Sequence, residues 1–385
     1  MSKSQATLGL IDHFSTLADP RQAWKVVYPL PEIMLTILSA TLASADDFVE
    51  IEEWGNANLP FLRGFLAYAD GIPSHDALND LVNALDPEVF KSCFSSWVAT
   101  LADAAPIDTE ACQLNVVNLD GKTSRRTHAR SKGRNPLHLV SAWAARQRLV
   151  LGQQAVDEKS NEITAIPHLL ERLELTGALV TIDAMGTQSE IAQAIVDKGA
   201  DYCLALKGNH PLLHADVERF FADPTSEGIT RAQTTDGDHG RIETRVHSVC
   251  HDVSWLFSDR RYTDEPKFPS LAMIGMIERI TEGRGAPERT RHYYLCSAKL
   301  DAVTFGRAVR AHWGIENRLH WVLDVVFHDD LSRLRSENGP QNMAIVKHMA
   351  INLLRAAKPT ASLKVRRKKA GWDTSYLKDV LSGAA

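Results

Sequence analysis

The order of strands and helices between residues 114 and 208 constrains the fold more than any other feature of the sequence. An amphipathic helix capped by Asn161 and a helix closed by Gly199 are predicted between apolar segments. Short strands are predicted at residues 114–120, 137–144, 148–156, 178–183 and 200–208. This alternation predicts an α/β domain, in which helices pack on a sheet.

The flanking regions differ from this central part in composition. Residues 8–110 read as helices. Residues 1–110 carry 16 acids against 5 bases, whereas residues 111–385 carry 32 acids against 38 bases. The acidity of the helical region favours a packing or partner-contact role over a main role in DNA recognition. Residues 301–325 read as one further helix, and a basic cluster at residues 364–369 lies in a tail that we expect to be partly mobile.

One stretch carries charge of a single sign. No acid occurs between Asp120 and Asp157, and the bases there are Lys122, Arg125, Arg126, Arg130, Lys132, Arg134, Arg146 and Arg148. Such a patch indicates a polyanionic partner, and a solvated surface loop is the alternative. Because its loop portion lies beside Asp120, we expect this stretch to be a main phosphate-contact surface.

Two acids follow predicted strands, and a third lies on the late helix. Asp120 and Asp183 each come where a strand is expected to end, and in open α/β sheets sites form outside the carboxyl ends of strands. Two close carboxylates repel each other unless a cation lies between them. Hard divalent ions such as Mg²⁺ or Mn²⁺, which prefer oxygen ligands, meet that need.

The third acid is Glu316, which has apolar and aromatic neighbours on a helix that we expect to be well buried. A buried carboxylate needs either a metal or a salt bridge, for which Arg310 and Arg318 are the candidates. His312 and His320 share its helix face at spacings of four residues. Core or DNA-facing histidines are commoner than zinc ligands, and the HExxH motif of zinc enzymes is absent here.

Longer motifs add to this pattern. The segments NLDGKTSRR, EKSNEITAIPHLL, VTIDAMGTQ, GADYCLALKGN, RAHWGIENRLHWVLDVVFHDDLSRLR and NMAIVKHMAINLL follow one another along the chain. DHFSTLADPR, YPLPEIM, EIEEWG and GIPSHDALNDLV precede them. Together they closely resemble bacterial insertion-sequence DDE transposases of the H-repeat-associated (ISAs-type) group. The resemblance covers about residues 10 to 380.

The resemblance implies an RNase H-like catalytic core with a small all-α domain before it. The domains expected from it are a helical transposase-associated domain at 1–110, the catalytic domain at 111–355 and a basic C-terminal tail at 356–385. The chain between the second and third acids is far longer than the about 30 residues that a strand–helix–strand unit needs. We therefore expect a strand-rich insertion at about 208–300, outside the catalytic sheet.

The implied activity is metal-dependent DNA cleavage at the ends of an insertion sequence, followed by strand transfer into target DNA. Asp120, Asp183 and Glu316 would be the catalytic residues and the ligands of Mg²⁺ or Mn²⁺, with Asp120 bridging two ions. The DNA contacts expected are Lys122, Arg125, Arg126, Arg130, Lys159, Asn161, Lys207, Arg310, His312 and Arg318. For Lys159, Asn161 and Lys207, solvation or helix capping is the alternative.

Several other classes are disfavoured. The longest apolar stretch, residues 33–45, is too short for a bilayer, which takes about 20 residues. No signal peptide is evident, so we expect a cytoplasmic protein that associates with the nucleoid when bound to DNA. Five scattered cysteines without a CxxC pair exclude a four-cysteine zinc site.

Two alternative functions stay open at this point. The protein could be a metal-dependent nuclease or resolvase that cuts DNA without joining it. It could also be an inactive or domesticated copy that binds DNA without catalysis. In each case the partner expected is DNA, and a transposase would act as a homodimer or higher oligomer in the DNA complex.

Overall fold

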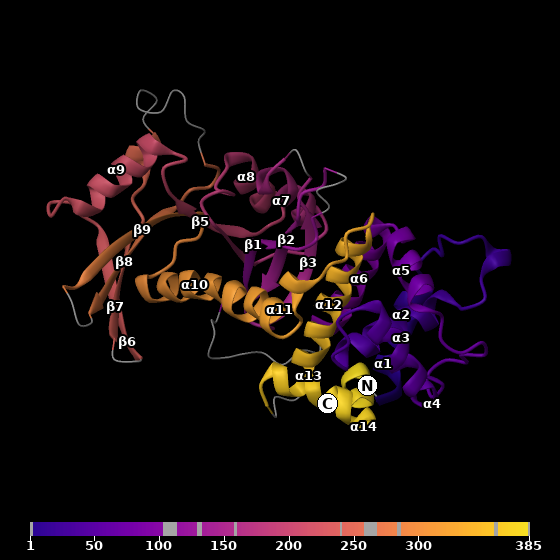
Figure 1. The fold of residues 1–385 in the computed structure, drawn as a ribbon. Coiled ribbons are helices and arrows are strands. Elements are labelled where there is room, and N and C mark those ends of the chain that lie inside the picture. The colour runs from indigo at the N-terminus through magenta and orange to yellow at the C-terminus, as the bar shows by residue number, and fades with distance from the viewer. Residues whose placement is uncertain are drawn as a thin grey trace.

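Figure 1 shows a computed structural model of the protein, with its two ends close together beside the helices of one half. The residues described are 3–102, 114–128, 133–157, 160–238, 241–257, 268–282, 286–357 and 361–383. The boundary expected at residue 110 and the expected contacts Arg130 and Lys159 lie outside these ranges.

The described strands form a single mixed sheet, so the predicted α/β class is confirmed. Its strand order is β3-β2-β1-β4-β5-β9-β8-β7-β6. The strands are β1 (Val116–Ser124), β2 (Leu137–Ala144), β3 (Leu149–Ala155), β4 (Leu179–Ile182), β5 (Asp201–Leu206), β6 (Ile229–Asp238), β7 (Arg241–Cys250), β8 (Met273–Glu282) and β9 (Glu288–Cys296). β1, β4 and β5 are parallel, and the other neighbouring pairs are antiparallel.

Helices cover both faces of this sheet (Figure 1). Those within and after the sheet are α7 (Glu162–Glu171), α8 (Ser189–Asp197), α9 (Pro211–Ala222), α10 (Ala302–Ile315), α11 (Trp321–Val325) and α12 (Gly339–Ala356). α7 begins where the Asn161 side chain accepts a hydrogen bond from the Ile163 N–H at 3.1 Å. α8 ends shortly before Gly199, whose φ of +67° suits glycine. Both predicted helix ends are confirmed.

The strand-rich segment extends the sheet rather than lying outside it. β9 pairs antiparallel with β5, with Cys203 opposite Cys296, and β8, β7 and β6 follow in turn. The prediction of an insertion outside the sheet is therefore wrong. β5 would otherwise be an edge strand, and its free backbone groups are satisfied by β9. α10 then runs beneath the sheet from the β6–β7 side to β1 (Figure 1).

The N-terminal helices pack against the C-terminal ones. They are α1 (Lys3–Ser15), α2 (Leu30–Leu42), α3 (Phe48–Ala57), α4 (Leu59–Leu62), α5 (His75–Ala84) and α6 (Pro87–Ala102). α12 contacts α2, α5 and α6, and one apolar cluster contains buried residues of both regions, such as Leu38, Phe94 and Leu353. α6 and α12 also contact β3, so this helical layer is joined to the edge of the sheet.

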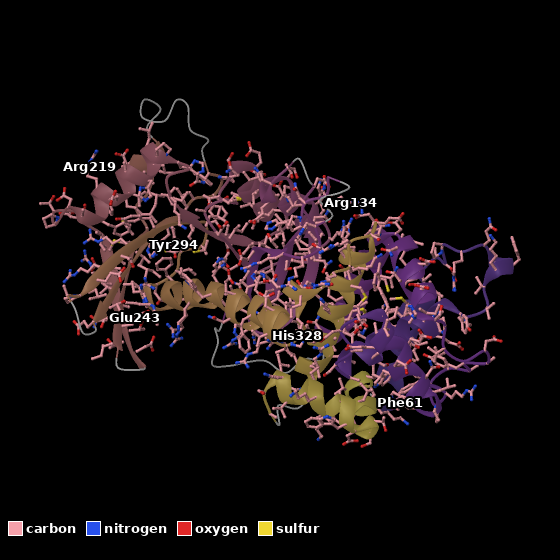
Figure 2. The ribbon with its side chains drawn as sticks, viewed as in Figure 1. Phe61, Arg134, Arg219, Glu243, Tyr294 and His328 are labelled. Carbon is pink, nitrogen blue, oxygen red and sulfur yellow. The ribbon has the colours of Figure 1, made fainter. Side chains whose placement is uncertain are left out.

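The basic segment near the C-terminus is structured, so the prediction of a mobile tail is wrong for residues 361–383. It forms α13 (Leu363–Trp372) and α14 (Thr374–Leu381). Arg367 is buried, donates to the carbonyl of Thr41 at 3.0 Å and to Asp46 at 2.8 Å, and lies over the Phe327 ring. Asp46 also lies 2.6 Å from Nδ1 of His328 (Figure 2).

Membrane insertion finds no support in the described ranges. The helices there are too short or too polar to cross a bilayer.

Candidate active site

Asp120 and Asp183 lie side by side where two parallel strands stop pairing. The last pair of the β1–β4 ladder is Leu119 with Ile182, and each acid is the next residue. β4 ends at this point, but β1 continues to Ser124 against β2. The prediction that Asp120 ends its strand is therefore wrong, because antiparallel pairing with β2 carries β1 further.

Alternation along β1 separates its apolar side chains from its polar ones. Val117 and Leu119 pack with apolar residues of α7 and α8. Asn118, Asp120 and Lys122 point to the opposite face, toward α10 and the residues that follow it. A row of polar side chains thus faces the helical segment that carries Glu316.

That segment is not one regular helix as predicted for residues 301–325. α10 ends at Ile315, a π-helical turn (η4) spans Glu316–His320, and α11 follows. An α-helix turns by about 100° per residue, so side chains four residues apart drift by about 40° around the axis. The wider π turn takes back part of this drift, and π turns are frequent at functional sites. Glu316 and His320 can therefore both face β1.

Asp120, Glu316 and His320 form a compact group. Nδ1 of His320 lies 3.6 Å from Oδ2 of Asp120 and 3.5 Å from Oε2 of Glu316. One ligand atom from each of the three lies within 4.8 Å of the others. The side chain of His320 is 6 % exposed and that of Glu316 57 %, so the group opens to solvent on the Glu316 side. His320 was not among the predicted site residues, although its shared helix face with Glu316 was a signal.

The electrostatics of the group favour a cation. Burial raises the pKa of Asp120 to about 8, and the charges of Glu316, Asp183 and Glu162 add to this effect. The Gly121 N–H, which donates to Asp120 at 3.0 Å, opposes it. The possible donors are two carboxylates and one imidazole, which are ligand types that divalent metal ions accept. The residues present therefore fit a divalent metal ion.

Comparison with known families agrees with this geometry. Residues 82–353 match the family model described as "Transposase DDE domain", and residues 11–98 match the one described as "DDE_Tnp_1-associated". The chain belongs to the DDE transposase family.

The similarity of the transposase to its relatives covers nearly its whole length. It is 36 % identical to "H repeat-associated putative transposase YhhI" of Escherichia coli (strain K12), over 97 % of this chain and 98 % of the relative. It is 37 % identical to "Putative transposase YncI" of Escherichia coli O157:H7, over 98 % of this chain and 95 % of the relative. The resemblance inferred from the motifs is confirmed.

Lys122 occupies a different environment from the one predicted for a phosphate contact. Its Nζ lies 2.7 Å from Asp324 and 3.5 Å from both Asp329 and Asp330, and its side chain is 9 % exposed. Burial alone would lower the pKa of Lys122, but these carboxylates outweigh it and raise the pKa. A buried ammonium that is paired with three carboxylates is poorly placed to meet DNA.

The other predicted DNA contacts of the transposase differ in exposure. Arg125 and Arg126 are exposed just beyond β1, and Lys207 is exposed just beyond β5. Asn161 uses its side chain to cap α7, as the alternative had it. Burial lowers the pKa of His312 to about 4, and its Nδ1 lies 2.9 Å from the Thr181 hydroxyl, so it faces the sheet.

The acid-free stretch is divided between two ends of the sheet. Arg125 and Arg126 follow the end of β1, where β2 begins. Arg146 and Arg148 lie in the β2–β3 hairpin, next to Val116 at the start of β1. Eight strand residues, or about 26 Å, separate these places. Antiparallel pairing of β1 with β2 therefore moves the two halves of the stretch apart, and its contact with phosphates stays a prediction.

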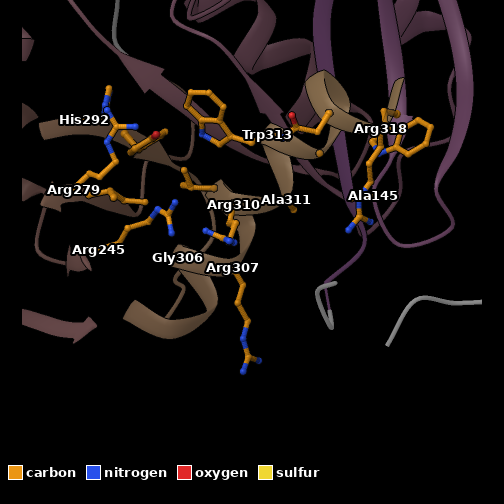
Figure 3. Close-up of a pocket in the computed structure, with 16 residues that line it drawn as sticks. Ala145, Arg245, Arg279, His292, Gly306, Arg307, Arg310, Ala311, Trp313 and Arg318 are labelled. Atoms are coloured by element: carbon orange, nitrogen blue, oxygen red, sulfur yellow. The ribbon is translucent and has the colours of Figure 1, made fainter. Parts of the chain in front are cut away.

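Arginines that are distant in sequence gather in a cavity of about 750 Å³ between α10 and the strands β7–β9 (Figure 3). Arg310 and Arg318 were predicted as DNA contacts and lie in it. Its other charged or aromatic lining residues are Arg245, Arg279, His292, Arg307, Trp143, Tyr294 and Trp313. Sequence reasoning missed Arg245, Arg279 and Arg307, since they are scattered over two strands and a helix and form no run of charge.

Proposed function

We propose that the protein is an active DDE transposase, which cleaves DNA at insertion-sequence ends and joins the released 3′ ends to target DNA. The observation that carries the proposal is the position of Asp120, which follows the last β1–β4 pair beside Asp183 and forms a compact group with Glu316 and His320. Family membership supports the class of reaction. We infer that the order β3-β2-β1-β4-β5, with β4 and β5 parallel to β1, is an RNase H-like core.

Asp120, Asp183 and Glu316 would hold Mg²⁺ or Mn²⁺, with His320 beside them. When bound, such ions activate water or a DNA 3′-OH and stabilise the leaving oxygen. Asp120 faces both other carboxylates and is the residue best placed to be shared. One nitrogen of His320 lies 3.6 Å from Asp120 and 3.5 Å from Glu316, so His320 is a further candidate ligand.

The DNA would approach from the open side of Glu316. The arginine-lined cavity reaches Arg318, two residues after Glu316, and would supply positive charge to the phosphate backbone. Two of its arginines, Arg245 and Arg310, also pair with Asp236. Arg125, Arg126 and Lys207 are exposed and remain proposed phosphate contacts. We further propose that two or more copies act together in the DNA complex.

The deciding experiment uses end-labelled DNA that contains candidate element ends, incubated with the protein and Mg²⁺. Products read at nucleotide resolution should show cuts at fixed positions, and a pre-cut end should be joined to a target plasmid. Cleavage without joining would indicate that the protein is a nuclease rather than a transposase. If neither the cleaved nor the joined product forms with any end tested, the proposal is refuted.

Asp183→Asn is the matched test of the site. It should reduce cleavage at least about 1,000-fold while DNA binding persists, since loss of one charge also relieves repulsion among the carboxylates. Asp197→Asn makes the same change on the exposed face of α8 and should cleave like the wild type. Cleavage by Asp183→Asn at a comparable rate would show that the assignment is wrong.

A further inference from the structure

The polar face of β1 contacts the late helical segment at several successive positions. We define the polar seam as these contacts, which join Asn118, Asp120, Lys122 and Ser124 to residues between 311 and 329. We infer that Lys122 is a positioning residue, which holds the segment carrying Glu316 against β1 and so places Glu316 beside Asp120. The inference rests on the proposed function, because it concerns the same metal site.

The contacts of Lys122 reach the Glu316 segment directly. Its closest partner, Asp324 at 2.7 Å, lies eight residues after Glu316 on α11. The side chain of Glu316 is itself 57 % exposed, so packing around that side chain does little to fix it. Its place beside Asp120 therefore depends on how the helix beneath it is attached to the sheet.

Asp329 forms the far end of the seam. It is buried, accepts a hydrogen bond from the Ser124 hydroxyl at 2.5 Å and another from the Lys347 ammonium at 2.7 Å. Lys122 lies 3.5 Å away. Lys347 belongs to α12, so this contact also ties the seam to the helical layer.

Asn118 forms the near end. Its amide lies 2.7 Å from the Thr181 hydroxyl, and the same amide reaches the backbone of Ala311 and His312 at 3.3 and 3.2 Å. Thr181 in turn contacts the His312 ring. Glu316 therefore lies between two attachments, one before the π turn and one after it.

The charged side chains of the seam pair with one another. Lys122 and Lys347 face Asp324 and Asp329, while Arg125 at the rim faces Asp330. The ammonium of Lys122 is thus already neutralised. If Lys122 instead bound a DNA phosphate, that phosphate would have to displace carboxylates from a nearly closed site. The two roles make opposite predictions for metal and for DNA.

The test uses two measurements on the full chain. Electron paramagnetic resonance gives Mn²⁺ binding in the absence of DNA, and binding isotherms at several salt concentrations give the affinity for DNA. Lys122→Met should weaken Mn²⁺ binding by about 10- to 100-fold, as changes of outer-shell partners do. Lys122→Arg should restore most of it. The slope of log DNA affinity against log salt should stay unchanged in Lys122→Met.

Arg126→Met removes a neighbouring exposed base and is the matched control. It should leave Mn²⁺ binding as in the wild type and lower the magnitude of the salt slope by about 0.9. Asp324→Asn provides a second variant if Lys122→Met fails to fold. It keeps the shape of a half-exposed partner, loses the charge, and should also weaken Mn²⁺ binding.

Wild-type Mn²⁺ affinity in both Lys122→Met and Asp324→Asn would overturn the inference. So would a fall of about 0.9 in the salt slope of Lys122→Met, which marks a phosphate contact. Asp120→Asn separates this failure from a failure of the proposed function. If Asp120→Asn binds Mn²⁺ as tightly as the wild type, the metal site is wrong and the positioning role falls with it.

Discussion

His348 should make the protein sensitive to mild acid. It lies on α12, is 1 % exposed, and its ring packs near Phe94. Burial lowers the pKa of His348 to about 3. The nearby cationic or titratable groups Lys347, His320 and Lys122 lower it further, while the charge of Asp329 opposes them.

The sign of the effect follows from proton binding. Below pH about 6.5 the unfolded chain protonates this histidine, while the folded chain leaves it neutral down to about pH 3. The unfolded state therefore binds more protons, and the free energy of unfolding falls as the pH falls. From pH 8 to pH 5 the loss from this side chain is about 2 kcal/mol.

The perturbation is His348→Leu, which removes the titrating group and keeps an apolar side chain of similar bulk. Urea unfolding at pH 8 and pH 5 gives the loss of stability for each protein, and the variant should lose about 2 kcal/mol less than the wild type. His168→Leu is the control, because its side chain is 66 % exposed. It should lose as much as the wild type. Equal losses in His348→Leu and the wild type would refute the reasoning.

Three shorter predictions concern other parts of the protein. Changing Arg125 and Arg126 together to Ala should lower the magnitude of the salt slope of DNA binding by about 2, and an unchanged slope would remove them from the interface. Gly275→Ala would place a Cβ 2.4 Å from the Phe305 ring, so β8 or α10 must shift. We expect a loss of about 1–3 kcal/mol in urea unfolding, and an unchanged midpoint would contradict that packing. Burial raises the pKa of the Cys296 thiol, so it should react with a thiol reagent only after denaturation; rapid labelling of this residue in the native protein would show otherwise.

The sequence was sufficient to predict those elements whose structure depends on local patterns. The strand predicted at 137–144 is β2 residue for residue, and the Asn161 cap opens α7. Buried strands and capped helices leave short-range signals, since apolar runs and capping side chains act within a few residues. The two strand-associated acids, Asp120 and Asp183, were found for the same reason.

Longer-range features left no comparable signal. The pairing of β5 with β9 joins residues about ninety positions apart, and neither strand shows which edge it will meet. The arginine cavity combines single residues from β7, β8 and α10, so no cluster of charge appears in the sequence. The π turn at Glu316–His320 changes the phase of a helix without changing its apolar pattern.

Asp120 and Asp329 differ in the charges that surround them. Both are acids of the polar seam with little exposure, yet their pKa values move in opposite directions. Burial and the negative charges of Glu316, Asp183 and Glu162 raise the pKa of Asp120. Burial acts on Asp329 too, but Lys347, the Ser124 hydroxyl and Lys122 outweigh it and hold its pKa well below the usual range.

The difference is one of charge balance rather than of depth in the fold. At Asp329 the protein supplies its own cations, Lys347 and Lys122, so the charge of this carboxylate is already balanced. At Asp120 the nearest charges are negative, and burial lowers the pKa of the nearby His320 imidazole. A cluster held together at such an electrostatic cost is understandable if a divalent ion supplies the missing charge. The seam then has a second role, since the neutralised ion pairs around Asp329 hold in place the segment that faces Asp120.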